Sequence, residues 1–182
     1  VSNGPEPIKK LPELRVNQLD ENLVVSGEDF IACFSSKSGW LSELTYKNED
    51  LIKKPLMANF WRAPTDNDLG NGMHKWANVW QNAGSNLVLE SLRSKTTEKG
   101  VKVSATYTSQ VFKGKYKVTY DINRLGEIQV AADLMLQGEQ SLPNLPKFGM
   151  QMVLNGQFEN LTWFGRGPHE SYWDRKTSAR IS

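Results

Sequence analysis

The sequence predicts a mainly β fold with antiparallel strands and one short helix. Three successive segments, residues 101–107, 116–122 and 128–136, alternate apolar and polar side chains with a period of two. That period is typical of strands with one buried face. Glycines lie between these segments, where tight turns between antiparallel strands need them. One further segment, residues 73–83, has the apolar spacing of a helix.

Composition and charge exclude several classes of protein. The chain has 182 residues, a net charge of +2 and 38% hydrophobic residues, which is ordinary usage for one folded domain. The small charge predicts no nucleic-acid partner, and the lack of an apolar run near 20 residues predicts no membrane partner. Cys33 is the one cysteine. With two histidines it leaves too few ligands for a four-ligand zinc site, so we expect neither a disulfide framework nor a metal in this chain.

The N-terminal part divides into a linker and the start of the domain. Residues 1–19 are predicted as a linker or the end of a preceding domain, because three prolines and a glycine fall within the first twelve positions. The domain itself is expected over residues 20–182. Two short apolar runs in residues 22–36 predict a hairpin, and another strand is predicted at residues 40–46.

A four-stranded antiparallel meander is the clearest part of the prediction. Its first strand is residues 86–95, and the three alternating segments follow it. In this register Val118 and Val130 fall in mid-strand on the buried face. Two further strands are predicted at residues 148–154 and 161–164, after a loop that contains two prolines.

A single helix is predicted at residues 73–83, where apolar side chains recur on one face. Asn71 is positioned to cap its start, and Gly84 follows its end, where a left-handed residue is common. The prediction is therefore a β domain with one short helix inserted.

Unusual polar residues gather in two tryptophan-rich windows, residues 60–70 and 163–176. In the first window Asp66, Asn67 and Asp68 offer the hard oxygen ligands that Ca²⁺ prefers, but the acidic residues that complete an EF-hand loop do not follow. The simpler alternative is an Asx-turn, in which these side chains bond their own backbone. We favour the turn.

The second window holds groups that can act as acids and bases. A glycosidase needs two facing carboxylates, for which Glu170 and Asp174 qualify. His169 with Glu170 is a second acid–base pair. Arg166 and Arg175 are close in sequence and offer ordinary ion-pair partners. Because neighbours on one loop rarely face each other across a substrate, we favour a structural role for this set.

The tryptophans and the cysteine also allow structural interpretations. Clustered tryptophan rings suit stacking on sugars, but in a β domain they more often belong to the core or to an interface. Cys33 lies inside an apolar run. It is therefore predicted to be a small buried hydrophobe.

The two windows resemble two signatures of the C-terminal β domain of bacterial β-galactosidases, glycoside hydrolase family 2. Residues 61–70 match Trp-Arg-Ala-Pro-x-Asp-Asn-Asp-x-Gly, and residues 163–175 match Trp-x-Gly-x-Gly-Pro-x-Glu-x-Tyr-x-Asp-Arg. The strand order and turn positions between them are similar as well, so the resemblance covers residues 20–182. Two long signatures in the same order are more specific than either alone.

The resemblance implies a fold and a place within a larger enzyme. The implied fold is a mainly β antiparallel supersandwich, galactose mutarotase-like in shape, which in the family continues beyond Ser182, so this chain is expected to be truncated at its C-terminus. The catalytic glutamates are expected in a barrel domain outside this chain, and no catalytic residue is assigned here. Mg²⁺ or Na⁺ is expected in that barrel too, with no cofactor in this chain.

The resemblance also implies roles for residues in both windows. A loop that opens at Gly70 is expected to lie at the active-site rim and to shift when ligand binds. The substrate-rim or hinge candidates are Asp66, Asn67, Asp68, Gly70 and Asn71. The structural signature residues are Trp61, Arg62, Trp163, Arg166, His169, Glu170, Tyr172, Asp174 and Arg175.

The sequence therefore predicts a fragment of a β-galactosidase that hydrolyses terminal β-D-galactosides. This domain is expected to complete the active-site rim and to make inter-domain or subunit contacts in a homo-oligomeric parent, with galactoside bound only in the full enzyme. The isolated chain is expected to be inactive. Two alternatives stay open: a stand-alone carbohydrate-binding module, and a mutarotase-like epimerase that uses His169 and Glu170.

Overall fold

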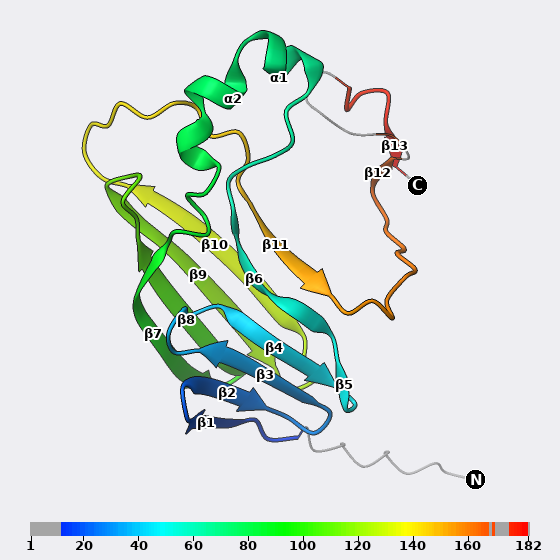
Figure 1. Ribbon diagram of the computed structural model, residues 1–182. Helices are drawn as coiled ribbons and strands as arrows, with labels where there is room; N and C mark the ends of the chain where they lie inside the picture. Colours follow the sequence, from blue (N-terminus) through cyan, green and yellow to red (C-terminus); the bar gives the residue numbers. More distant parts are fainter. Residues whose placement is uncertain (1–11, 168, 170–174, 182) are drawn as a thin grey trace.

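The computed structural model describes residues 12–167, 169 and 175–181, and nearly half of them lie in two antiparallel β-sheets packed face to face (Figure 1). One sheet has the order β1-β2-β3-β4-β6-β11, with β5 paired to β4, and the other has the order β10-β9-β8-β7. A separate pair, β12 and β13, lies near the C-terminus. The prediction of a mainly β antiparallel fold is confirmed. The strands are β1 (Arg15–Leu19), β2 (Asn22–Ser26), β3 (Phe30–Ser35), β4 (Leu41–Tyr46), β5 (Glu49–Asp50), β6 (Ile52–Asn59), β7 (Val88–Thr97), β8 (Gly100–Thr108), β9 (Gly114–Asn123), β10 (Ile128–Leu136), β11 (Gly149–Leu154), β12 (Arg166–Gly167) and β13 (Arg180–Ile181).

The second sheet is the predicted meander. Its four strands follow one another in sequence and pair antiparallel, with Val118 of β9 opposite Ala132 of β10. At Gly100, where β8 begins, φ is 151° and a Cβ atom would lie 2.0 Å from the carbonyl oxygen of Ile122. A side chain has no room there, so this turn requires glycine.

Aromatic side chains from both sheets fill the core. Trp40, just before β4, stacks on Tyr107 of β8 with ring centroids 4.2 Å apart. Phe34 of β3 meets Tyr120 of β9 edge-on at 4.9 Å. Burial of each ring contributes roughly 2–3 kcal/mol to folding. Cys33 is buried as predicted, and this burial raises the pKa of its thiol to about 11.

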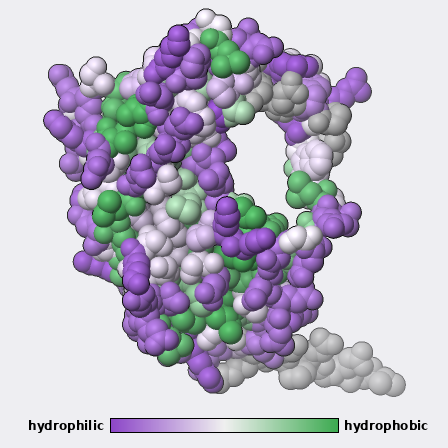
Figure 2. All heavy atoms as spheres, viewed as in Figure 1, coloured by the Kyte–Doolittle hydropathy of each residue, from purple (hydrophilic) through white to green (hydrophobic). Residues whose placement is uncertain are grey.

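The edge strands of the sandwich leave apolar side chains exposed. Val118, on a central strand, is fully buried, but Val130 on the edge strand β10 is 37% exposed, so the prediction that it is buried is wrong. Val130 lies opposite Tyr120 and shares its face of the sheet. Its period-2 pattern was therefore correct, but a side chain at the margin of a sandwich is covered from fewer directions. β11 is an edge as well, and Figure 2 shows apolar side chains gathered around its end, where Met152 and Leu154 are exposed.

The first sheet begins earlier than the apolar pattern indicated. The hairpin β2–β3 and strand β4 are where they were predicted. β1, however, lies within residues 1–19, the segment interpreted as a linker or the end of a preceding domain, and it pairs with β2 along its whole length. Four of its five residues are exposed, so its sequence carries little of the apolar alternation that identifies a strand.

The segment between β6 and β7 contains three short helical pieces: α1 (Asp66–Gly70), α2 (Met73–Trp76) and the 3₁₀ turn η1 (Asn78–Trp80). The predicted helix at residues 73–83 is wrong in length, because α2 ends at Trp76, and the next residue, Ala77, interrupts the helix with a φ of −101° and a ψ of 2°. Among the described residues, no helix is both long and apolar enough to cross a membrane. The predicted apolar face is nevertheless largely buried, through Met73, Ala77, Trp80 and Ala83.

The predicted caps of that helix are wrong too. Asn71 ends α1 and does not cap α2, which is preceded by Gly72 in a left-handed conformation with φ 76°. Gly84 is not left-handed. A Cβ atom on Gly84 would lie 2.3 Å from the carbonyl oxygen of Ala58, so this glycine permits close packing against β6.

Residues 161–164 form no strand, and that prediction is also wrong. They belong to an irregular segment that leaves the sandwich after β11 and leads to β12 (Figure 1). Leu161 and Phe164 are more than four-fifths exposed. Apolar composition favours a strand, but a strand also needs a hydrogen-bonded neighbour, and the described residues supply none here.

Candidate functional site

The first signature lies where the chain leaves β6 and enters α1, at the end of the molecule opposite the N-terminal strands (Figure 1). Asn59 ends β6, and its side-chain oxygen accepts a hydrogen bond from the Trp61 amide over 3.0 Å. Thr65 then adopts an extended conformation and caps α1. Its hydroxyl oxygen accepts from the Asp68 amide over 3.3 Å, while the Asp68 carboxylate accepts from the Thr65 amide over 2.8 Å. This reciprocal capping box fixes the start of the helix.

Asp68 is surrounded by hydrogen-bond donors. The Arg62 guanidinium donates to both of its carboxylate oxygens, at 2.8 Å for Oδ1, and the Thr65 hydroxyl donates to Oδ2 at 2.9 Å. Arg62 and the Thr65 amide therefore hold the pKa of the Asp68 carboxyl well below its usual range. Arg62 also donates through Nε to the carbonyl oxygen of Pro146 over 3.3 Å. Asp68 is thus an ionised group engaged within the fold.

This geometry replaces the Asx-turn predicted at residues 66–68 with the first turn of a helix. Asp68 is no longer a good Ca²⁺ ligand, because its oxygens already accept bonds from Arg62 and Thr65. In the part of the chain that the structure describes, no group of three or more His, Cys, Asp or Glu residues is arranged to hold a metal ion.

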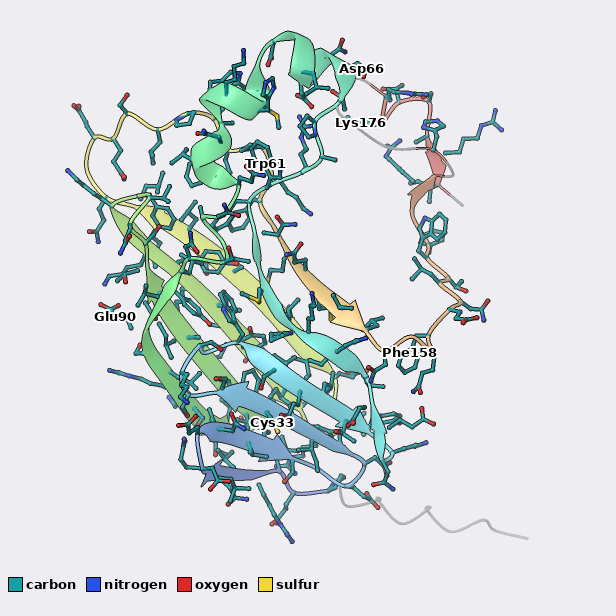
Figure 3. All side chains as sticks on the ribbon, viewed as in Figure 1. Cys33, Trp61, Asp66, Glu90, Phe158 and Lys176 are labelled. Atoms are coloured by element: carbon teal, nitrogen blue, oxygen red, sulfur yellow. The ribbon has the colours of Figure 1, made fainter. Side chains whose placement is uncertain are left out.

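Asp66 and Asn67 lie on the same helix as Asp68 but are exposed. Figure 3 shows Asp66 at the start of α1, at the same end of the molecule as Lys176 of the C-terminal segment. A carboxylate in the first turn is favourable because it faces the positive end of the helix dipole. The first signature therefore divides into an inward acid, Asp68, and two outward polar residues.

The residues after α1 include one left-handed glycine. Gly70 is the last residue of α1 and is not left-handed, and its role as a hinge stays a prediction. The left-handed residue is Gly72, and a Cβ atom there would meet nothing within 4 Å. Asn71 lies between the two glycines, and its side-chain oxygen accepts a hydrogen bond from Trp76 Nε1 over 3.2 Å. Asn71 thus connects the end of α1 to α2.

The second signature contains β12, which pairs with β13 in the two-stranded sheet near the C-terminus. Arg166 donates from Nη1 to the carbonyl oxygens of Lys176, at 2.7 Å, and Ala179, at 3.0 Å. The Trp163 ring is 56% exposed, and a Cβ atom on Gly167 would lie 3.2 Å from it. Arg166 therefore joins β12 to the segment that returns to β13.

Four matched positions of the second signature lie outside the described residues, namely Pro168, Glu170, Tyr172 and Asp174. The structural role favoured for this set stays a prediction, and the acid–base pairs with Glu170 stay the alternative to it. His169 Nε2 lies 3.4 Å from the Ser178 hydroxyl oxygen, and that hydroxyl donates to the Arg175 carbonyl oxygen over 2.8 Å.

An open pocket of about 700 Å³ lies apart from both signatures, at the turns that join β7 to β8 and β9 to β10. Its lining includes Glu98, Asp121 and Glu127, and none of the described signature residues lines it. Lys102 donates to Asp121 over 2.6 Å in a half-exposed ion pair. The pocket therefore lies at a different place from the signatures, whose polar groups are held by specific hydrogen bonds.

Sequence reasoning missed three parts of this site. The spacing Thr65-x-x-Asp68 is a capping-box signal and indicates where α1 begins. The only sequence signal for the left-handed residue was the presence of two nearby glycines, Gly70 and Gly72, which does not show which of them is left-handed. The contact with the Pro146 carbonyl could not be predicted from any sequence signal, because that carbonyl is a backbone group 84 positions away from Arg62.

The fold and the two signatures define an antiparallel β-sandwich domain of the kind found in glycoside hydrolase family 2. The family described as beta galactosidase small chain matches residues 26–182, and the chain belongs to this family. It is 34% identical to a β-galactosidase of Priestia megaterium over 171 residues, which are 94% of this chain and 16% of that protein.

Other relatives give the same result. Identity to a β-galactosidase of Lactobacillus delbrueckii subsp. bulgaricus is 34%, over 96% of this chain and 18% of that protein. Identity to a β-galactosidase of Clostridium acetobutylicum is 33%, over 93% of this chain and 19% of that protein. The chain therefore spans less than one fifth of the length of these curated relatives.

Proposed function

We propose that this chain is an accessory β domain of a β-galactosidase that hydrolyses terminal β-D-galactosides. In this proposal the catalytic glutamates, and any Mg²⁺ or Na⁺, belong to a barrel domain outside the chain. Membership of the small-chain family and the names of the relatives support the enzyme class. The rim role rests on one observation, the division of the first signature into an anchored Asp68 and the exposed Asp66 and Asn67.

The exposed pair has suitable chemistry for a sugar. A carboxylate accepts hydrogen bonds from hydroxyl groups, and an amide both donates and accepts them. Asp66 and Asn67 offer both kinds of group side by side on α1. They would contact a galactoside only where the barrel domain brings its active site to this end of the molecule.

Asp68 does not suit catalysis by this chain itself. The general acid of a glycosidase needs a carboxyl group whose pKa is raised. Arg62 instead lowers the pKa of Asp68 and keeps the carboxylate ionised. This supports a parent enzyme whose acid and nucleophile lie elsewhere.

The exposed apolar side chains support contacts with other parts of the parent. Apolar residues that gather at the surface commonly mark an interface. Here they lie around the end of β11 and along the segment that includes Leu161 and Phe164 (Figure 2). We assign inter-domain or subunit contacts, in a homo-oligomeric parent, to these surfaces.

Kinetics of the parent enzyme test the rim role. Asp66→Ala and Asn67→Ala are each expected to lower kcat/KM for a chromogenic galactoside at least tenfold, which corresponds to about 1.4 kcal/mol or more. Asp29→Ala, at an exposed turn between β2 and β3, is the control and should change nothing. Unchanged kinetics in both α1 variants would overturn the rim role. The isolated chain should show no hydrolysis, and measurable turnover by it would overturn the accessory role.

A carbohydrate-binding module is the second candidate, because Trp76 and Trp163 are both exposed. It predicts that the isolated chain binds galactose or lactose in calorimetry and that Trp76→Ala or Trp163→Ala abolishes the binding. The accessory-domain proposal predicts no measurable heat in the same titration.

A further inference from the structure

α1 lacks the packing that normally holds a helix in place. None of its five residues is buried, and a helix this short is not stable by itself in water. Its neighbour α2 differs, since Met73 at its start is buried in the core. The position of α1 must therefore depend on polar contacts made around its first turn.

Those contacts converge on the pair Arg62 and Asp68. Arg62 precedes the helix, Asp68 belongs to it, and Arg62 Nε also bonds Pro146 in the loop between β10 and β11. The same loop accepts a hydrogen bond from Trp80 Nε1 through the Pro143 carbonyl, at 3.0 Å. The pair thus joins α1 to a loop that also accepts a hydrogen bond from Trp80, at the end of η1.

The environment of the Arg62–Asp68 pair makes it strong enough to hold α1 in position. The Arg62 and Asp68 side chains are 27% and 15% exposed, compared with 41% and 46% for Lys102 and Asp121. A more sheltered pair is less screened by water and salt. The contact is also bidentate, which fixes the orientation of the two planar groups as well as their distance.

We infer that Arg62 and Asp68 are positioning residues that set the place of α1 and so direct Asp66 and Asn67 toward the substrate. This inference rests on the proposed rim role. The pair itself does not contact substrate, since the oxygens of Asp68 already accept bonds from Arg62 and Thr65. Its effect on the reaction passes through the two exposed residues.

Amide hydrogen exchange in the 182-residue chain tests the positioning step without any need for activity. Asp68→Asn keeps the shape of the side chain and removes its charge, so exchange at residues 66–71 should accelerate at least tenfold. Asp68→Glu keeps the charge and the capping box, and it should restore most of the protection. Asp121→Asn, which removes the half-exposed ion pair with Lys102, is the matched control and should leave exchange at residues 66–71 unchanged.

Kinetics of the full-length parent test the link to substrate. Asp68→Asn and Arg62→Lys should lower kcat/KM about tenfold, mainly through a higher KM, because the displaced residues bind the sugar and do not react with it. Asp68→Glu should recover the KM. A variant that merely misfolds would lose active enzyme, and so lower the apparent kcat at an unchanged KM.

The two measurements separate the possible failures. Unchanged exchange at residues 66–71 in Asp68→Asn would overturn the positioning role, whatever the kinetics. Faster exchange with an unchanged KM would show that the pair holds α1 but that α1 is not at the rim, which would overturn the proposed function. Faster exchange together with a raised KM that Asp68→Glu restores is the result that the inference predicts.

Discussion

The centre of the β8–β9 sheet and the α1 segment are held by different forces. Val118 and Tyr120 of β9 are fully buried and owe their place to apolar contact with the opposite sheet. α1 has no residue in the core and owes its place to a capping box and to the Arg62–Asp68 pair. The difference shows that one set of residues stabilises the domain and another set determines the geometry around α1. Changes in the sheet should unfold the domain, whereas changes around α1 should alter the site in a domain that stays folded.

The largest effect is expected from Val118→Asp. It places an unpaired charge in the core and should destabilise the domain by about 4 kcal/mol or more. Lys117→Gln, one position along on the opposite face of β9, is the control and should stay within about 0.5 kcal/mol of the wild type. Urea denaturation measures both. Similar losses in the two variants would mean that the sandwich is not packed as described.

Gly84→Ala is expected to be the next most severe change. The new methyl group would lie 2.3 Å from the backbone oxygen of Ala58. A backbone atom cannot move aside as the end of a flexible side chain can. Overpacking of this kind should cost about 1–3 kcal/mol, seen as a lower urea midpoint. A variant as stable as the wild type would show that the helical segment does not pack closely on β6.

Asp68→Asn is expected to have a smaller effect that depends on pH. Because Arg62 lowers the pKa of Asp68 in the folded state, the ionised carboxylate stabilises the fold above its unfolded pKa of about 3.9. The difference between wild type and variant should therefore be complete above about pH 5, at roughly 1 kcal/mol, and should shrink as the pH falls toward 2.

Melting curves recorded from pH 2 to pH 7 measure this difference, which should stay within about 4 °C. Asp66→Asn is the comparison, because Asp66 is exposed and forms no ion pair with the described residues. A difference that grows as the pH falls would contradict the ionised pairing of Asp68 with Arg62.

The smallest effects are expected at the two glycines that flank Asn71. Gly72→Ala forces a side chain into a left-handed conformation and should cost about 1 kcal/mol, although the space around it is open. Gly70→Ala lies at the end of α1 and should be neutral or stabilising by about 0.5 kcal/mol. In the parent enzyme we expect Gly72→Ala to change kcat and KM and Gly70→Ala to leave them closer to the wild type. The reverse order would support the predicted hinge at Gly70.

The sequence predicted the regions that apolar packing determines. The alternation from Val101 to Leu136 and the turn glycines give the meander directly, because each strand has one buried face. The exposure of side chains on edge strands could not be predicted from the alternation. Val130 has the right phase but lies on an outer strand. Strand β1 was missed because pairing with β2 holds it in the sheet while most of its side chains stay exposed.

The candidate site was predictable only in its location. The two windows stand out by their composition, and the family resemblance drew attention to the Asp-Asn-Asp run. Which of the three residues faces inward depends on a helix too short to show a period and on an arginine four positions earlier than Asp66. The Pro146 contact depends on the whole fold, because the chain must complete the second sheet before that carbonyl reaches Arg62.

Hydrogen exchange of the full-length parent with and without a non-hydrolysable thiogalactoside tests the account most directly. Ligand at a rim that includes α1 should slow exchange at residues 66–72 several-fold. The central strands β8 and β9 should exchange at the same rate in both states, because their amides are protected by the sheet and lie away from α1 (Figure 1). Equal exchange at residues 66–72 in the two states, with the ligand shown to be bound, would contradict the account.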